Sequence, residues 1–465
     1  MAIASGRPRI LIGATGSGAG KTTVTVGLIA ALRSRGMRVA AFKCGPDYLD
    51  PTYHARAAGA VSHNLDGWMM GRDAVLATFT RCSAEADVSV IEGVMGLFDG
   101  ASPASEEGST AEIAKWLGAP VILVTDASGM ARTIAAVAHG FAHFDPAVKL
   151  AGLICNRIGG RRHLDLLREA SAEIPVLGGL PVDDAAAFPE RHLGLFYADE
   201  AHVPGARIEA CGRNAAEWFD LDAMIAIARS APALADCASG EGVRARRRDP
   251  RCRIGIAQDE AFHFYYDDNL RRLESLGAEL APFSPIRDAA PPAADGLYFG
   301  GGYPEAHARA LAENRPMLEA VRSMLRRGVP IYAECGGLMY FARAIRVLDG
   351  GVFPMIGAIP AEAVMHDRLQ ALGYVEVETT RPTILGAAGL RFRGHQFRYS
   401  TLVPEPHGIE RAYAVRPRRS AGFDEGFSAG NLLASYVHAH WASNPQAAAG
   451  FVDACAAARA RTLPR

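Results

Sequence analysis

The sequence predicts an α/β protein, and three observations support this fold class. Apolar, strand-like segments alternate with helix-like segments through the first half of the chain. A glycine-rich turn at residues 13–20 joins the first of these strands to a helix. In the second half, strand-like runs lead into glycine turns at 300–302 and 336–337. Such alternation is typical of parallel sheets covered by helices.

Composition narrows the classes of function. A chain of 465 residues predicts two or three domains, each large enough to bury a core. The net charge of −1, from 49 basic and 50 acidic residues, argues against a nucleic-acid binder. We find neither a transmembrane-length apolar run nor a signal peptide, so no membrane association is expected. Eight scattered cysteines without Cys-x-x-Cys argue against zinc and disulfides and favour the cytoplasm.

Five strands are predicted in the first half, at 9–12, 39–43, 88–92, 121–125 and 150–156. In an open parallel sheet, ligands bind beyond the carboxyl ends of the strands. The polar residues that follow these strands are therefore the first candidates for a site.

The turn after the first strand has the features of a phosphate-binding loop. Lys21 can reach the β- and γ-phosphates, and the Thr22 hydroxyl can bind Mg²⁺. The strict pattern requires glycine where this chain has Thr15, so a glycine turn without a ligand is the alternative. The residues predicted to contact ATP are Thr15, Gly16, Gly18, Gly20, Lys21, Thr22 and Thr23.

Other strand ends carry carboxylates and an amide. Asp47 and Glu92 are predicted Mg²⁺ ligands, since Mg²⁺ favours one or two carboxylates beside phosphate oxygens. Asn156 is a candidate for the adenine site. Three residues are candidates for substrate contacts, although each could equally stabilise its loop: Tyr48, Asp50 and Asp99.

A linker is predicted at 232–251, which is rich in small, glycine and charged residues. A second set of candidate catalytic residues follows it in the sequence. Cys335 lies between a strand and Gly336-Gly337, which outlines a nucleophile elbow. A helix N-terminus at this turn would favour the thiolate. The alternative is a small core residue. Gly301, Gly302 and Gly336 are candidates for an oxyanion hole.

A cysteine nucleophile needs a base nearby in space. His438 is the best candidate, in a run at 434–441 that is apolar enough to form one strand. Alternation along a strand would place His440 on the same face, so one of the two could be structural. The histidines at 263, 307, 366 and 395 lack this context.

These motifs together resemble the corrinoid a,c-diamide synthases, which are glutamine-dependent amidotransferases of cobalamin biosynthesis. Within the first loop, Gly16 stands where partitioning ATPases carry an extra lysine, so the loop is similar to the dethiobiotin-synthetase branch. The resemblance covers nearly the full length and rests on these stretches: 13–23, 43–51, 91–100, 156–157, 300–305, 334–337 and 436–441.

The resemblance implies two doubly wound domains. A dethiobiotin-synthetase-like phosphate-loop NTPase domain would span 1–231, and a class I glutamine amidotransferase domain 252–448, followed by a C-terminal helix or tail at 449–465. Cys335 would attack glutamine with His438 as base. ATP would activate a corrinoid carboxylate as an acyl phosphate, which ammonia would convert to the amide. Thr22, Asp47 and Glu92 would hold Mg²⁺.

One position departs from the wider class I pattern, in which His-x-Glu supplies a carboxylate that orients the base. Here the sequence is His438-Ala439-His440. The alternatives are a cobyric acid synthase, a nickel-sirohydrochlorin a,c-diamide synthase, an ATP sensor with an inactive glutaminase domain, or a nucleotide-switch protein. The sequence leaves open whether the chain forms a homodimer.

Overall fold

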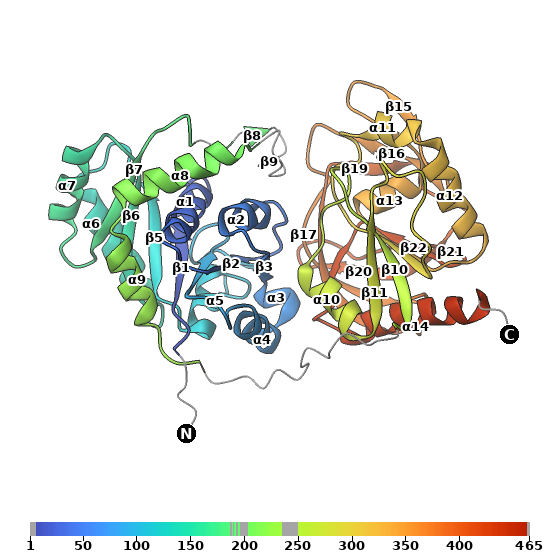
Figure 1. The fold of residues 1–465 in the computed structure, drawn as a ribbon, viewed down its shortest axis with the longest axis horizontal. Coiled ribbons are helices and arrows are strands. Elements are labelled where there is room, and N and C mark those ends of the chain that lie inside the picture. The colour runs from blue at the N-terminus through green and yellow to red at the C-terminus, as the bar shows by residue number, and fades with distance from the viewer. Residues whose placement is uncertain are drawn as a thin grey trace. The chain divides into compact units, whose positions relative to one another are not determined.

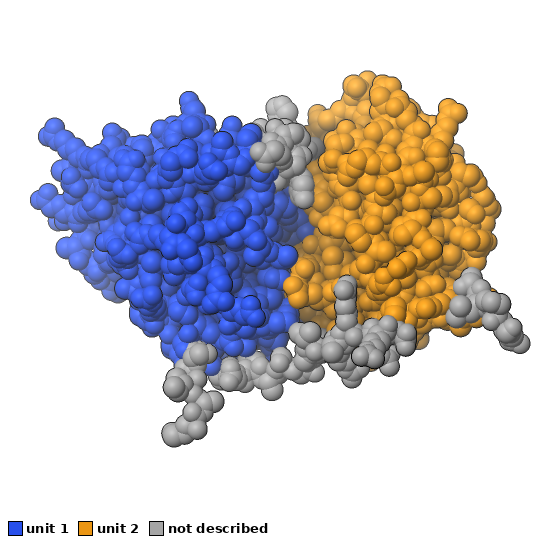
Figure 2. All heavy atoms as spheres, viewed as in Figure 1, with its two compact units in different colours: residues 1–239 blue, residues 240–465 orange. Residues whose placement is uncertain are grey.

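The computed structural model describes residues 6–186, 188, 190–191, 194–195, 203–234 and 250–462. The chain divides into two compact units, residues 1–239 and 240–465 (Figures 1 and 2). The border falls within the predicted linker at 232–251, of which 235–249 lie outside the described residues. No helix in the described ranges combines the length and apolarity needed to cross a membrane.

Unit 1 contains, over its described residues, a seven-stranded parallel sheet in the order β3-β2-β4-β1-β5-β6-β7 (Figure 1). All five predicted strands are present, each ending within two residues of its predicted end; the polar strand β3 was not predicted. The strands are β1 (Arg9–Ala14), β2 (Val39–Cys44), β3 (Ser62–Leu65), β4 (Val88–Glu92), β5 (Val121–Asp126), β6 (Leu150–Ile158) and β7 (Val176–Pro181), with a separate short pair β8 (Glu190–Arg191) and β9 (Gly194–Leu195).

Helices cover both faces of this sheet, because parallel crossovers are right-handed and the strand order reverses direction at β4. One face carries α1 (Lys21–Ser34), α2 (Asp50–Ala58), α8 (Gly205–Trp218) and α9 (Leu221–Arg229). The remaining helices complete the crossovers on the other face: α3 (Gly67–Met70), α4 (Arg72–Cys82), α5 (Thr110–Leu117), α6 (Thr133–Phe144) and α7 (Arg161–Ala170). Ser109 caps the N-terminus of α5, since its Oγ accepts a hydrogen bond from the Glu112 N–H at 3.1 Å.

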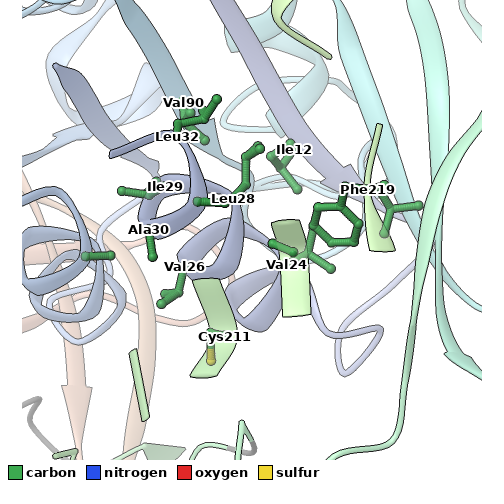
Figure 3. Packing of buried hydrophobic residues seen from close by; sticks show 14 of the residues in the cluster. Ile12, Val24, Val26, Leu28, Ile29, Ala30, Leu32, Val90, Cys211 and Phe219 are labelled. Atoms are coloured by element: carbon green, nitrogen blue, oxygen red, sulfur yellow. The ribbon is translucent and has the colours of Figure 1, made fainter. Parts of the chain in front are cut away.

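Helix α1 is buried along most of its length. Val24 and Leu28 pack in the same core as Ile12 of β1 and Val90 of β4 (Figure 3). On its other side α1 contacts α8, where a Cβ at Gly27 would lie 2.9 Å from a backbone oxygen of α8. This packing holds the N-terminus of α1, and with it the glycine loop, at the carboxyl edge of the sheet.

Unit 2 is built, in its described part, on a ten-stranded mixed sheet in the order β11-β10-β12-β13-β22-β21-β20-β17-β18-β23. The first five are parallel, and the run from β22 to β23 is antiparallel. The strands are β10 (Cys252–Ala257), β11 (Ala278–Phe283), β12 (Gly296–Phe299), β13 (Ile331–Glu334), β17 (Ala371–Thr379), β18 (Arg391–Arg398), β20 (Glu410–Pro417), β21 (Phe423–Ala429), β22 (Leu432–Ser435) and β23 (His438–His440).

A smaller four-stranded sheet and several helices complete unit 2. The small sheet has the order β15-β14-β16-β19 over the residues described, with β14 (Ala342–Arg346), β15 (Val352–Pro354), β16 (Ile359–Met365) and β19 (Ser400–Val403). The helices are α10 (Asp267–Ser275), α11 (Ala308–Glu313), α12 (Arg315–Arg326), α13 (Gly336–Phe341) and α14 (Pro445–Thr462). The predicted tail at 449–465 is, where described, part of α14, whose Phe451 and Val452 are buried in the core of this unit.

The prediction of one strand through 434–441 was wrong. The run is broken at Tyr436-Val437, and its halves pair differently: β22 pairs in parallel with β13, and β23 in antiparallel with β18. A buried carboxylate accounts for the break, because Glu425 accepts hydrogen bonds from the Ser435 hydroxyl and the Tyr436 N–H. Only two residues separate β22 from β23. The antiparallel run of strands that begins at β22, next to β13, therefore ends at a strand that directly follows β22 in the chain.

Two candidate active sites

The glycine loop of unit 1 has the backbone that its sequence predicts. It runs from the end of β1 to Lys21 at the start of α1, with Gly18 and Gly20 at φ 77° and 95°. A Cβ at Gly20 would collide with the side-chain amide of Asn156, so glycine is required there. Lys21 is buried, and its Nζ donates to the Met95 carbonyl oxygen at 2.5 Å. The Lys21 ammonium is thereby held beside the loop.

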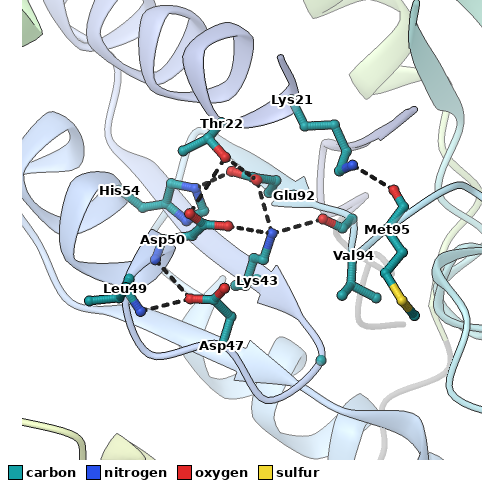
Figure 4. Close-up of polar contacts among 12 residues, drawn as sticks. Lys21, Thr22, Lys43, Asp47, Leu49, Asp50, His54, Glu92, Val94 and Met95 are labelled. Carbon is teal, nitrogen blue, oxygen red and sulfur yellow. Dashed lines mark hydrogen bonds and ion pairs between the residues drawn. The ribbon is translucent and has the colours of Figure 1, made fainter. Parts of the chain in front are cut away.

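A compact polar cluster lies beside Lys21 (Figure 4). Thr22 Oγ1 donates to Glu92 Oε1 at 2.9 Å. Lys43 Nζ lies 2.9 Å from the same oxygen and 2.7 Å from Asp50 Oδ2. His54 Nε2 is 2.5 Å from the other Glu92 oxygen. Because Lys43, His54 and Glu92 are almost completely buried, this cluster is a preorganised charged centre at the sheet edge.

Burial and charge act in opposite directions within the cluster. Burial alone would raise the pKa of Glu92, but Lys43 and His54 outweigh it and lower that pKa. Burial would lower the pKa of Lys43, but Asp50 and Glu92 raise it. Burial and the neighbouring Asp47 raise the pKa of Asp50. A cation bound beside Asp50 would favour the ionised form of this carboxyl.

Three other predicted residues of unit 1 make hydrogen bonds that hold the loops around the cluster. Asp47 Oδ1 accepts the backbone N–H groups of Leu49 and Asp50 at 2.7 and 2.9 Å, so this oxygen holds the loop. The Thr15 N–H donates to Val124 O at 3.0 Å. Asn156 donates to Ala19 O at 3.0 Å and so braces the loop.

A cavity of about 540 Å³ joins these groups. Nine predicted residues line it: Gly18, Gly20, Lys21, Thr22, Thr23, Asp47, Asp50, Glu92 and Asn156. Leu180 and Phe188 contribute apolar surface at its wall. Thr15, Gly16, Tyr48 and Asp99 are not among its described lining residues; Tyr48 is half-buried, and Asp99 is exposed and accepts the Gly96 N–H at 3.0 Å. The volume suits a nucleotide-sized ligand.

In unit 2, Cys335 adopts the backbone expected of a nucleophile elbow. It lies between β13 and α13 with φ 48° and ψ −99°, a conformation that L-residues rarely adopt. The predicted glycines pack against this turn: the Gly337 N–H donates to Gly300 O at 3.0 Å, and a Cβ at Gly336 would lie 3.0 Å from Gly302 N. The cysteine turn and the glycine turn therefore form one site.

His438 reaches the same site from β23. A Cβ at Gly301 would collide with Cε1 of its ring, so this histidine lies directly against the glycine turn. Burial lowers the pKa of His438 to about 3. Burial also raises the pKa of Cys335 to about 12, which outweighs the Arg398 charge and the hydrogen bond from the Gly336 N–H. In the free protein the Cys335 side chain is therefore a thiol rather than the expected thiolate, and the His438 imidazole is neutral.

This resting state predicts the pH dependence of Cys335 alkylation in the free protein. Only the thiolate reacts, so the iodoacetamide rate at Cys335 should rise about tenfold per pH unit from pH 7 to pH 9. The rate is measured by mass spectrometry of the Cys335 peptide, with Cys335→Ser as the blank. A rate that levels off below pH 8 would instead indicate a thiolate stabilised by the turn.

Sequence reasoning missed several residues of both sites. Lys43 and His54 belong to the charged cluster, and the signal for Lys43 was a cation at the end of an apolar strand. Glu334 is completely buried directly before Cys335, where a carboxylate ending an apolar strand was the signal. His395 stacks on His438 with ring centroids 4.9 Å apart and planes at 17°. Only the pairing of β18 with β23 reveals His395.

Two family models match the chain, one in each unit. Residues 10–195 match the CobQ/CobB/MinD/ParA nucleotide binding domain. Residues 253–446 match the CobB/CobQ-like glutamine amidotransferase domain.

Curated relatives extend the similarity over almost the whole chain. A protein of Leptospira interrogans named cobyrinate a,c-diamide synthase is 51% identical over 450 residues, covering 96% of this chain and 98% of the relative. A protein of the same name from Syntrophotalea carbinolica is 47% identical over 456 residues, covering 96% and 98%. A solved structure described as a glutamine amidotransferase is 18% identical, covers 43% of this chain and 98% of its own, and has a TM-score of 0.33.

Proposed function

The chain belongs to the family of cobyrinate a,c-diamide synthases, and from that premise we propose its reaction. It amidates the a and c carboxylates of cobyrinate or hydrogenobyrinate in cobalamin biosynthesis, using ATP and glutamine. It is a ligase that forms C–N bonds, with an ATP-dependent unit and a glutaminase unit.

One observation carries this proposal: a single chain holds both a phosphate-binding cavity and a cysteine elbow with its base. The cavity brings Lys21 together with Thr22 and Glu92. The elbow brings Cys335 to the glycine turn that His438 contacts. A nucleotide switch would need only the first of these sites, whereas a glutamine-dependent synthetase needs both.

In the glutaminase half-reaction, His438 takes the proton of the Cys335 thiol as sulfur attacks the side-chain amide carbon of glutamine. The glycine-turn N–H groups stabilise the developing oxyanion. His438 then returns the proton to the leaving nitrogen, and ammonia departs. Water hydrolyses the remaining thioester to glutamate, with His438 again as base.

In the synthetase half-reaction, a corrinoid carboxylate oxygen attacks the γ-phosphorus of ATP and ADP leaves. Ammonia then attacks the acyl carbon of the acyl phosphate, and phosphate departs. Lys21 offsets the charge on the phosphate oxygens, and loop N–H groups orient them. Substrate roles for Tyr48 and Asp99 stay predictions, as does the Asn156 contact with adenine.

The donor set of the charged cluster fits Mg²⁺, because it consists of a hydroxyl and carboxylate oxygens. Thr22, Glu92 and Asp50 would hold the ion, which neutralises phosphate charge when bound. Asp50 takes this role in preference to Asp47, because Asp47 Oδ1 is occupied by two loop N–H groups. Lys43 and His54 orient Glu92 through its two oxygens.

This assignment predicts how amidation depends on Mg²⁺. Glu92→Gln and Asp50→Asn should each raise the half-saturating Mg²⁺ concentration by about tenfold or more, because an ion ligand loses its charge. Asp47→Asn is the matched control, since an amide oxygen can still accept the loop N–H groups. An Asp47→Asn shift as large as that of Asp50→Asn would return the ligand role to Asp47.

The test of the proposed function is an end-point assay by mass spectrometry. The protein is incubated with ATP, Mg²⁺ and glutamine, and with cobyrinate or hydrogenobyrinate in separate tubes. We expect a product in which two carboxylates have become amides, and the reactive tube identifies the macrocycle. Hydrolysis of ATP without amidation of either would overturn the proposal, and four further amides on a diamide substrate would favour a cobyric acid synthase.

We expect the enzyme to act in the cytoplasm; the described cysteines are all free, as a reducing compartment requires. Its partners are the small molecules ATP, glutamine and the corrinoid polycarboxylate. A homodimer stays a prediction.

A further inference from the structure

The chain lacks the carboxylate that commonly follows a glutaminase base by two residues. His440 occupies that position and is buried, with its ring 4.7 Å from that of Tyr266. We propose that Glu334 and His395 are positioning residues that orient His438 in place of that carboxylate. The inference rests on the proposed roles of Cys335 and His438.

The first support is a clamp on the backbone beside the base. The Ala439 N–H donates to Glu334 Oε1 at 3.0 Å. On the opposite side, the Ala439 carbonyl oxygen accepts from Asn269 Nδ2 at 2.8 Å, and Asn269 Oδ1 accepts the Trp441 N–H at 2.8 Å. Both backbone polar groups of the residue after His438 are therefore held by buried side chains.

Glu334 is itself held rigidly. Its Oε1 accepts the Tyr332 hydroxyl at 2.9 Å, and its Oε2 accepts the Tyr298 hydroxyl at 2.8 Å. All three side chains are almost completely buried. Because Glu334 precedes Cys335 in the chain, this carboxylate links the nucleophile turn to the strand of the base. A movement of the cysteine turn would therefore be transmitted to β23 through the hydrogen bond between Glu334 and the Ala439 N–H.

The second support is a slot around the imidazole. His395 lies opposite His438 in the pairing of β18 with β23, and its ring is stacked on that of His438. The Tyr266 hydroxyl lies 3.2 Å from His395 Nδ1 and anchors the stacked ring. A Cβ at Gly394 would collide with the His438 carbonyl oxygen, so glycine is needed for this close approach.

Gly301 contacts the His438 ring as well. The imidazole therefore sits between the stacked His395 and the glycine turn, with its backbone fixed at Ala439. Orientation of a general base is worth a large rate factor, since a displacement of about 1 Å can cost about 10²-fold. In this chain, ring packing and the hydrogen bonds at Ala439 orient the base, whereas a carboxylate orients it in the wider class I pattern.

The experiment measures glutamine hydrolysis by the full chain in the presence of ATP, Mg²⁺ and cobyrinate. His395→Ala should lower kcat by about 10- to 100-fold with KM for glutamine within about twofold, because binding survives while the base is misplaced. His395→Phe keeps a flat ring in the stack and should stay within about threefold of the wild-type kcat. An unchanged kcat in His395→Ala, or an equal loss in both variants, would overturn the stacking role.

Glu334 gives a second, independent pair of variants. In Glu334→Gln an amide oxygen can still accept the Ala439 N–H, so kcat should fall by less than about tenfold, whereas Glu334→Ala should lose about 10²-fold. Equal losses would overturn the clamp. An unchanged thermal transition and glutamine KM show that unit 2 remains folded.

The proposed function is tested separately in the same assay. Wild-type hydrolysis that Cys335→Ala abolishes supports the glutaminase role, whatever the His395 and Glu334 variants do. Hydrolysis that persists in Cys335→Ala contradicts the proposed function and the inference with it.

Discussion

Replacement of Lys21 by alanine should remove amidation with either glutamine or ammonium as the nitrogen source. The ammonium group is buried beside the loop, and its pKa is lowered by burial and by Lys43, so phosphate oxygens are its natural partners. Loss of one such preorganised charge typically costs about 10²- to 10³-fold in rate. The product is measured by mass spectrometry at saturating ATP.

Arg35→Ala is the control for loss of a positive charge near the same helix. Arg35 forms an exposed ion pair with Asp222 at 2.6 Å, and such pairs contribute little to stability or function. Amidation by Lys21→Ala within about tenfold of the wild-type rate would mean that the loop is not the catalytic nucleotide site.

Replacement of Cys335 by alanine should separate the two half-reactions. Synthesis from glutamine should disappear, because alanine lacks the thiol that attacks the glutamine amide. Synthesis from added ammonium salt should continue, because every described residue that lines the phosphate-binding cavity belongs to unit 1. Both rates are read from the same amide product, so the comparison does not depend on the assay.

Cys252→Ala tests whether loss of any buried thiol in unit 2 has the same effect. Cys252 lies in β10, is completely buried, and contacts neither the glycine turn nor the elbow in the described interactions. It should keep both activities. If ammonium fails to support synthesis by Cys335→Ala while Cys252→Ala is active, the two sites do not work independently.

Much of each site could be predicted from local sequence. Each of the signals lies within a few neighbouring residues. They are glycines at left-handed positions, a lysine and threonine at the start of a helix, and carboxylates at the ends of strands. The same holds for Cys335, whose left-handed turn between a strand and two glycines follows from the local chain. These features depend on backbone sterics and short-range hydrogen bonds, which neighbouring residues determine.

The choice among nearby carboxylates could not be predicted in this way. Asp47 and Asp50 are three residues apart, yet one caps its own loop while the other meets Lys43 across the cluster. Both line the cavity, and which of them meets Lys43 depends on where α2 begins and how it packs on α1. Burial then raises the pKa of Asp50, as it raises that of the Cys335 thiol.

The sequence by itself determined the two chemistries, the parallel sheet of unit 1, and the residues at the phosphate loop and the elbow. Only the tertiary structure decided that the strand of the base breaks at Tyr436, and that His395, 43 positions before His438, stacks on it. The physical reason is that strand pairing joins residues far apart in the chain. The register of this pairing is set by the burial of whole faces of the sheet, and it cannot be predicted from the spacing of residues within one segment.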